Sequence, residues 1–224
     1  TPASCNVCNM STRRKAAKSG TRRTTKSSSP AKTAGKKLTK AQLSRLDEQQ
    51  AIDLGRERLD SGDLDGASEI AGMLIGRDEN SGPGYALKGL VAYRAKRYAD
   101  AVDDLRKAIE IRPRDVVSIS NLGAALSELG NRESAIAIFR RALKIEPANP
   151  GAVRNMVIAM AQANRMDEAI AVLRRALTVD PGFAAGYALF GDVERRRGRL
   201  LHARSHYCRA IALEPDNAEF WNGL

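Results

Sequence analysis

The sequence is poor in aromatic residues, cysteine and long apolar runs, and each shortage argues against a class of protein. Aromatic residues make up 4% of the 224 residues, which disfavours a β-sandwich because strands favour aromatic and β-branched side chains. Three cysteines are too few for a small secreted domain held by disulfides, so we expect a reducing, cytoplasmic setting. No apolar run approaches the roughly 20 residues that a membrane-spanning helix needs.

The net charge of +11 is concentrated at one end of the chain. Before Asp47 there are twelve Lys or Arg and no Asp or Glu, whereas the rest of the chain carries 25 basic and 26 acidic residues. The tail lacks hydrophobic periodicity and cannot bury enough apolar surface to offset its chain entropy. We therefore expect residues 1–38 to form a disordered basic tail. Its candidate roles are weak contact with nucleic acid or acidic surfaces, or simple solubilisation and tethering.

One segment of thirteen residues recurs along the rest of the chain. The copies are AVDDLRKAIEIRP at 101–113, AIAIFRRALKIEP at 135–147, AIAVLRRALTVDP at 169–181 and ARSHYCRAIALEP at 203–215. Each copy starts 34 residues after the previous one and ends in proline. The apolar residues follow helical spacing, and a polar turn precedes each copy, so each unit is predicted to contain two amphipathic helices.

Small residues keep the same register in these units. They allow facing helix axes to approach to about 8–10 Å, and the prolines end the second helix of each unit. One helix pair cannot bury its apolar face alone, whereas stacked pairs bury a continuous core. The predicted packing residues are Gly89, Ala101, Ala108, Gly123, Ala135, Ala142, Ala169, Ala176, Gly191, Ala203 and Ala210.

The 34-residue period and the pattern Leu122-Gly123…Ala135…Phe139…Ala142…Pro147 resemble tetratricopeptide repeats. The resemblance implies an all-α fold, a right-handed α-solenoid of stacked antiparallel helix pairs whose first helices line a concave face. We expect this solenoid to cover residues 39–217. The five repeats would be 48–81, 82–115, 116–149, 150–183 and 184–217.

Both ends of the solenoid carry further expectations. Thr39 and Gln42 match a capping box, after which Leu43, Leu46 and later Leu54 are predicted to begin a helical stripe. Residues 218–224 are interpreted as the start of a truncated sixth repeat, so we expect the natural protein to continue. The uncovered C-terminal edge is then a candidate surface for self-association.

Asn121 and Asn155 occupy equivalent inward-facing positions, 34 residues apart. An asparagine amide can donate to a backbone carbonyl and accept from a backbone N–H, so such a pair can hold a peptide without reading its sequence. The arrangement is similar to the asparagine ladder of O-linked N-acetylglucosamine transferases, although only two rungs are present. The equivalent positions hold Asp53, Leu87 and Leu189. The alternative is that both asparagines are ordinary polar residues of the groove.

Three arginines complete the predicted peptide-binding groove. Arg154 is the only cation at the positions that match the carboxylate clamp of related repeat proteins, so that clamp is not expected. Arg94 and Arg195 lie late on first helices and are candidates for positive charge in the groove. The alternative is that they are solvated helix ends, where arginine favours the helix dipole.

No metal, cofactor or catalytic site is predicted. Cys5 and Cys8 form a lone CxxC without a second pair, and structural zinc needs four ligands. His202 and His206 lie at i, i+4 spacing without a third ligand, so we interpret them as surface or inter-repeat packing groups. The chain has no nucleophile motif, phosphate loop or dinucleotide fingerprint, so we expect no enzyme activity in these residues.

Two functions from different classes fit this pattern. The first is a protein–protein interaction scaffold that binds a peptide or helix in the concave groove. The second is the non-catalytic N-terminal arm of a larger enzyme, similar to glycosyltransferases or sulfotransferases, whose catalytic domain lies beyond Leu224. In both cases, the groove receives a protein partner.

Overall fold

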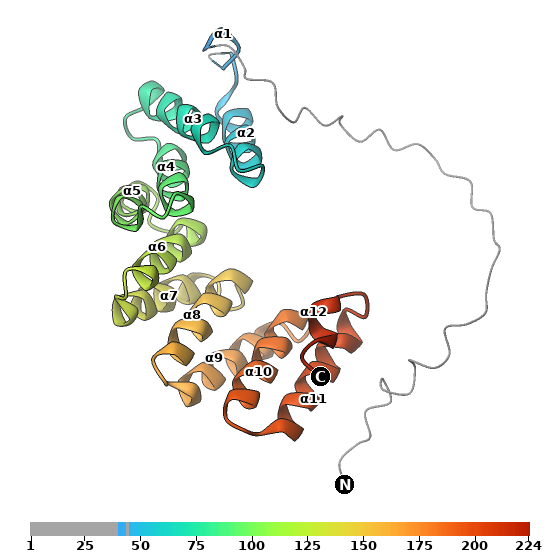
Figure 1. The fold of residues 1–224 in the computed structure, drawn as a ribbon. Helices are drawn as coiled ribbons and strands as arrows, with labels where there is room; N and C mark the ends of the chain where they lie inside the picture. Colours follow the sequence, from blue (N-terminus) through green and yellow to red (C-terminus); the bar gives the residue numbers. More distant parts are fainter. Residues whose placement is uncertain (1–39, 44) are drawn as a thin grey trace, which may run out of the picture.

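The computed structural model describes residues 40–43 and 45–224 as helices joined by short turns, arranged in an arc (Figure 1). Consecutive helices form antiparallel pairs, and the pairs stack into a right-handed α-solenoid, as predicted. The predicted basic tail and Thr39 lie outside the described residues. The helices are α1 Lys40–Leu43, α2 Glu48–Asp60, α3 Leu64–Arg77, α4 Gly82–Arg94, α5 Tyr98–Ile111, α6 Val116–Glu128, α7 Arg132–Ile145, α8 Pro150–Gln162, α9 Met166–Val179, α10 Ala184–Arg196, α11 Leu200–Leu213 and α12 Ala218–Trp221.

Glycines on the first helices lie against large side chains of the second helices. A Cβ at Gly123 would lie 2.5 Å from Cε1 of the Phe139 ring. The same modification at Gly89 would bring a Cβ to 2.7 Å from Cγ of Leu105. These distances leave no room for a methyl group, so the glycines set how closely the two helices of a repeat approach.

The alanines predicted to pack are buried. Each is at most 3% exposed, and the three predicted glycines are buried as well. The apolar side chains around them form a central core from α4 to α10, with smaller cores at either end of the solenoid. The buried alanines are Ala101, Ala108, Ala135, Ala142, Ala169, Ala176, Ala203 and Ala210.

The turn inside each helix pair contains one residue in the left-handed backbone conformation. These residues share a position 34 residues apart, and their φ angles lie between 59° and 81°. Glycine takes this conformation without steric cost, whereas a side chain disfavours it. Three of the five positions are glycine, while the second and fourth pairs use a lysine and an asparagine. The residues are Gly62, Lys96, Gly130, Asn164 and Gly198.

The helical stripe predicted to run through Leu43 and Leu46 is interrupted, so that prediction is wrong. Helix α1 ends at Leu43, and α2 begins only after Asp47. Asp47 Oδ1 accepts from the Gln50 backbone N–H at 2.7 Å, and Gln50 Oε1 accepts from the Asp47 N–H at 3.1 Å. This reciprocal capping box satisfies two first-turn donors and starts a new helix there. Leu43 and Leu46 nevertheless pack against the N-terminal core.

His206 is a packing residue, and it packs between α10 and α11, the two helices of one predicted repeat. Its ring stacks on Phe190 with centroids 3.9 Å apart and an interplanar angle of 10°. Burial lowers the pKa of His206 below its ordinary value of 6.5, and the positive charges of His202 and Arg174 lower it further. Glu194 on α10 acts in the opposite direction. The folded chain therefore favours the neutral imidazole.

Gly123→Ala is expected to destabilise the fold by about 1–3 kcal/mol, because the added methyl group forces the Phe139 ring or the helix backbone to move. Urea unfolding followed by circular dichroism measures the change. Gly72→Ala on α3 is the matched control, since a Cβ there meets no atom within 4 Å. The control should gain up to about 1 kcal/mol from helix propensity. Equal effects of the two variants would contradict the close approach at Gly123.

His206→Phe should remove part of the acid sensitivity of the fold while keeping the stack on Phe190. Below pH 6.5 the unfolded chain takes up a proton at His206 more readily than the folded chain does, so stability falls as pH falls. Above pH 6.5, His206 is neutral in both the folded and the unfolded chain, so its burial does not reduce the stability of the fold. Urea unfolding between about pH 7.5 and about pH 5 measures the slope. A slope in His206→Phe equal to that of the wild type would contradict the assignment.

Candidate functional site: the concave groove

The first helices of the repeats lie on the concave side of the arc (Figure 1). Residues of these helices and of the segments next to them line two pockets. We call them the N-terminal pocket, of about 580 Å³, and the C-terminal pocket, of about 390 Å³. The N-terminal pocket is lined by Gln49, Ile52, Arg56, Pro83, Ala86, Leu87, Leu90, Arg112, Pro113, Arg114, Asp115, Val117, Ser118 and Asn121. The C-terminal pocket is lined by Pro150, Gly151, Arg154, Phe183, Ala185, Ala188, Leu189, Asp192, Arg195, Tyr207, Glu219, Phe220, Asn222 and Gly223.

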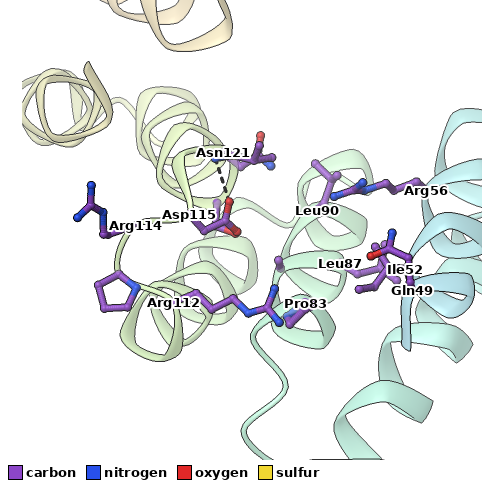
Figure 2. Close-up of a pocket in the computed structure, with 14 residues that line it drawn as sticks. Gln49, Ile52, Arg56, Pro83, Leu87, Leu90, Arg112, Arg114, Asp115 and Asn121 are labelled. Carbon is purple, nitrogen blue, oxygen red and sulfur yellow. Dashed lines mark hydrogen bonds between the residues drawn. The ribbon is translucent and has the colours of Figure 1, made fainter. Parts of the chain in front are cut away.

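The N-terminal pocket has an apolar floor. Ile52 comes from α2, and Leu87 and Leu90 come from α4 (Figure 2). Val117 of α6 is 57% exposed, although it is one of the larger apolar residues. Apolar side chains left accessible inside a concave surface are typical of ligand and peptide sites.

At α6, the N-terminal pocket is lined by the residue that caps the helix and by an asparagine side chain. Asp115 is the N-cap of α6, and its carboxylate accepts from the Val117 N–H at 3.1 Å and from the Ser118 hydroxyl at 2.6 Å. Asn121, on the next turn of α6, lines the same pocket and is half-buried (Figure 2). Its side-chain amide makes no hydrogen bond to another of the described residues. It is therefore available to a ligand backbone.

The C-terminal pocket contains an ion pair. Arg195 Nη2 lies 2.9 Å from Asp192 Oδ1, and the Tyr207 hydroxyl donates to the same carboxylate oxygen at 2.7 Å. Burial raises the pKa of Tyr207, and this hydrogen bond to Asp192 raises it further. Arg154 and Glu219 also line the pocket, so its lining carries two positive and two negative side chains.

The structure separates the residues predicted for the groove. Asn121 lies in the N-terminal pocket, whereas Arg154 and Arg195 lie in the C-terminal pocket. Asn155 is half-buried on α8, between the helices that line the two pockets, and it lines neither. Arg94 is the last residue of α4 and lies 4.0 Å from Asp60, so it is part of an exposed ion pair at the helix end.

Sequence reasoning missed the arginines of the N-terminal pocket. Arg56 lies on α2, and Arg112 and Arg114 flank Pro113 in the link between α5 and α6. The predicted groove residues all lie on first helices, whereas the links that precede those helices also border the groove. Arginines on either side of the repeat-ending proline were the available signal.

Two negative findings concern the described residues alone. Their helices are all too short or too polar to cross a membrane. Nor do three or more His, Cys, Asp or Glu side chains gather there as a group that could hold a metal ion.

The fold is shared with several solved structures. MamA matches with a TM-score of 0.61 and 21% identity over 74% of this chain and 96% of that chain. TTC0263, a thermophilic tetratricopeptide-repeat protein of Thermus thermophilus, matches with a TM-score of 0.65 and 17% identity over 79% and 96%. YrrB, described as having an unusual peptide-binding site, matches with 0.56 and 20% over 79% and 91%. At these identities the similarity concerns the fold.

The sequence also matches the family directly. Two tetratricopeptide-repeat profiles match residues 52–116 and residues 130–190, which together make up more than half of the chain. No curated protein matches closely enough to count as a relative. The repeat period, the stacked helix pairs and both profile matches agree, and the chain therefore belongs to the tetratricopeptide-repeat family.

Proposed function

We propose that this chain is a non-catalytic scaffold that holds a peptide or helix of a partner protein in its concave groove. Proteins with this fold generally mediate protein–protein interactions, and the fold supplies a rigid surface that loses little conformational entropy on binding. The apolar floor of the N-terminal pocket supplies contact area. The amides of Asn121 and Asn155 orient the ligand backbone.

The observation that carries the proposal is the state of these two amides. Asn121 and Asn155 are half-buried at equivalent positions of α6 and α8, which contact each other. Across the part of the chain that the structure describes, neither side chain is hydrogen-bonded to another residue. Half-buried amides without internal partners suit a ligand that brings its own donors and acceptors, as a peptide backbone does.

A solved structure of similar fold supports a peptide ligand. YrrB is described as having an unusual peptide-binding site, and it covers 79% of this chain. The concave pockets of the present chain lie on the surface that a stack of first helices offers to a ligand. This similarity supports the class of partner and does not identify it.

The enzyme-arm interpretation uses the same surface in another context. There, the groove would present a protein substrate to a catalytic domain elsewhere in a longer chain. The described residues carry no feature that favours this role over a free-standing scaffold. Both interpretations require a protein segment in the groove, so a binding experiment tests what they share.

Peptides selected from a random-sequence display library on the full chain should bind about tenfold more weakly to Asn121→Ala/Asn155→Ala, because the backbone loses its amide partners. Fluorescence anisotropy with the labelled peptides measures the affinities. Asn80→Ala/Asn131→Ala is the matched control, since both residues are exposed and line neither pocket. The control should bind as the wild type does.

Equal binding by the wild type and the Asn121→Ala/Asn155→Ala variant would show that these amides do not hold the ligand. Failure to select any peptide would contradict the proposed function as a whole. Circular dichroism of each variant checks that the helices are retained.

A further inference from the structure

The N-terminal pocket differs from the rest of the groove in its charge. Three arginines line it and one acid lines it, namely Asp115. The Asp115 carboxylate already accepts two hydrogen bonds as the cap of α6, from the Val117 N–H and the Ser118 hydroxyl. It is therefore committed to the helix end, and the pocket presents net positive charge to a ligand.

Two of the arginines are available. Arg56 and Arg114 are exposed, and within residues 40–43 and 45–224 neither forms an ion pair or a side-chain hydrogen bond. Arg112 lies 3.5 Å from Glu48, with both side chains more than half exposed. Such an exposed pair is weak and can exchange partners with a ligand carboxylate.

The arginines come from opposite sides of the apolar floor. Arg56 extends from α2 on the side of Leu90, whereas Arg112 extends toward Pro83 from the link after α5 (Figure 2). The Arg112 side chain also covers Gly82, where an added Cβ would lie 2.9 Å from its Cγ. A ligand lying on the floor is therefore bordered by guanidinium groups on both sides.

The acids three residues before and four residues after Arg56, on the same face of α2, already have partners. Asp53 Oδ1 accepts from Gln49 Nε2 at 2.9 Å, and Asp60 lies 4.0 Å from Arg94. The segment that contributes Arg56, residues 48–81, contains nine acids and three bases, but none of those acids lines the pocket.

The C-terminal pocket lacks this imbalance. Its two arginines, Arg154 and Arg195, are matched by Asp192 and Glu219, and Arg195 is paired with Asp192 at 2.9 Å. The groove is thus positive at one end and balanced at the other. A ligand with carboxylates at one end would bind in one direction only.

Building on the proposed function, we infer that the N-terminal pocket binds an acidic segment of a partner protein, with Asp or Glu side chains beside apolar ones. The apolar side chains lie on Ile52, Leu87 and Leu90. The carboxylates meet Arg56 and Arg112, whose planar guanidinium groups suit carboxylate recognition. Arg114 points away from the floor and adds positive charge at the rim of the pocket (Figure 2). The lining has no aromatic ring on which a nucleic-acid base could stack, so a protein segment fits better than single-stranded nucleic acid.

The test sorts a random-sequence peptide display library on the full chain and compares the charge of the peptides retained. Wild type should enrich acidic peptides with apolar residues, and their affinity should fall as salt is raised. Arg56→Gln/Arg114→Gln should bind those peptides about tenfold more weakly. Arg132→Gln/Arg174→Gln is the matched control, with both substitutions on second helices, and should bind as the wild type does.

Three outcomes would overturn the inference. The first is enrichment of neutral or basic peptides, and the second is equal binding by wild type and Arg56→Gln/Arg114→Gln. The third is displacement of the acidic peptide by a polyuridylate oligonucleotide of comparable affinity. If peptides are still weakened by Asn121→Ala/Asn155→Ala in these cases, the groove function stands and only the acidic specificity fails. If no peptide binds, the proposed function fails with it.

Discussion

Contact between a small residue on the first helix of a repeat and a large side chain on the second is the interaction on which the solenoid depends. Gly89 meets Leu105, Gly123 meets Phe139 and Gly191 meets the Tyr207 ring. This contact sets the spacing inside each pair, and the buried alanines of the second helices add no bulk that would force the packed helices apart. Close stacking in turn places the first helices side by side along the concave face. The pockets are therefore consequences of the packing, and the exposed residues that line them are free to contact a ligand.

Much of the fold was predictable because its signals are local and repeated. The 34-residue period, the buried alanines and the prolines after each second helix all report the same geometry, and the structure places them as that geometry requires. Helical spacing was a less reliable guide at the N-terminal end of the solenoid. Leu43 and Leu46 follow helical spacing, but the Asp47–Gln50 capping box ends the continuity. Lys96 and Asn164 take a left-handed turn position that only the register with Gly62, Gly130 and Gly198 reveals.

The site was only partly predictable because a pocket joins residues that are distant in sequence. Asn121 could be placed in the groove from its repeat position alone. Arg56 and Arg114 lie 58 positions apart, on a first helix and on a link between helices, and no periodic pattern connects them. Their shared pocket depends on how far each link projects over the neighbouring repeat. The charge balance of the C-terminal pocket likewise depends on the pairing of Arg195 with Asp192, which requires side-chain geometry.

The central claim is that the concave first helices, and not the convex second helices, hold the partner. Hydrogen–deuterium exchange of the full chain, with and without a saturating library-selected peptide, tests this claim most directly, because it reports on every helix at once. We predict slower exchange in α2, α4, α6 and α8 and in the link before α6, with little change in α5 and α7. Protection concentrated on α5, α7 or α9 would place the binding surface on the convex side and contradict the claim.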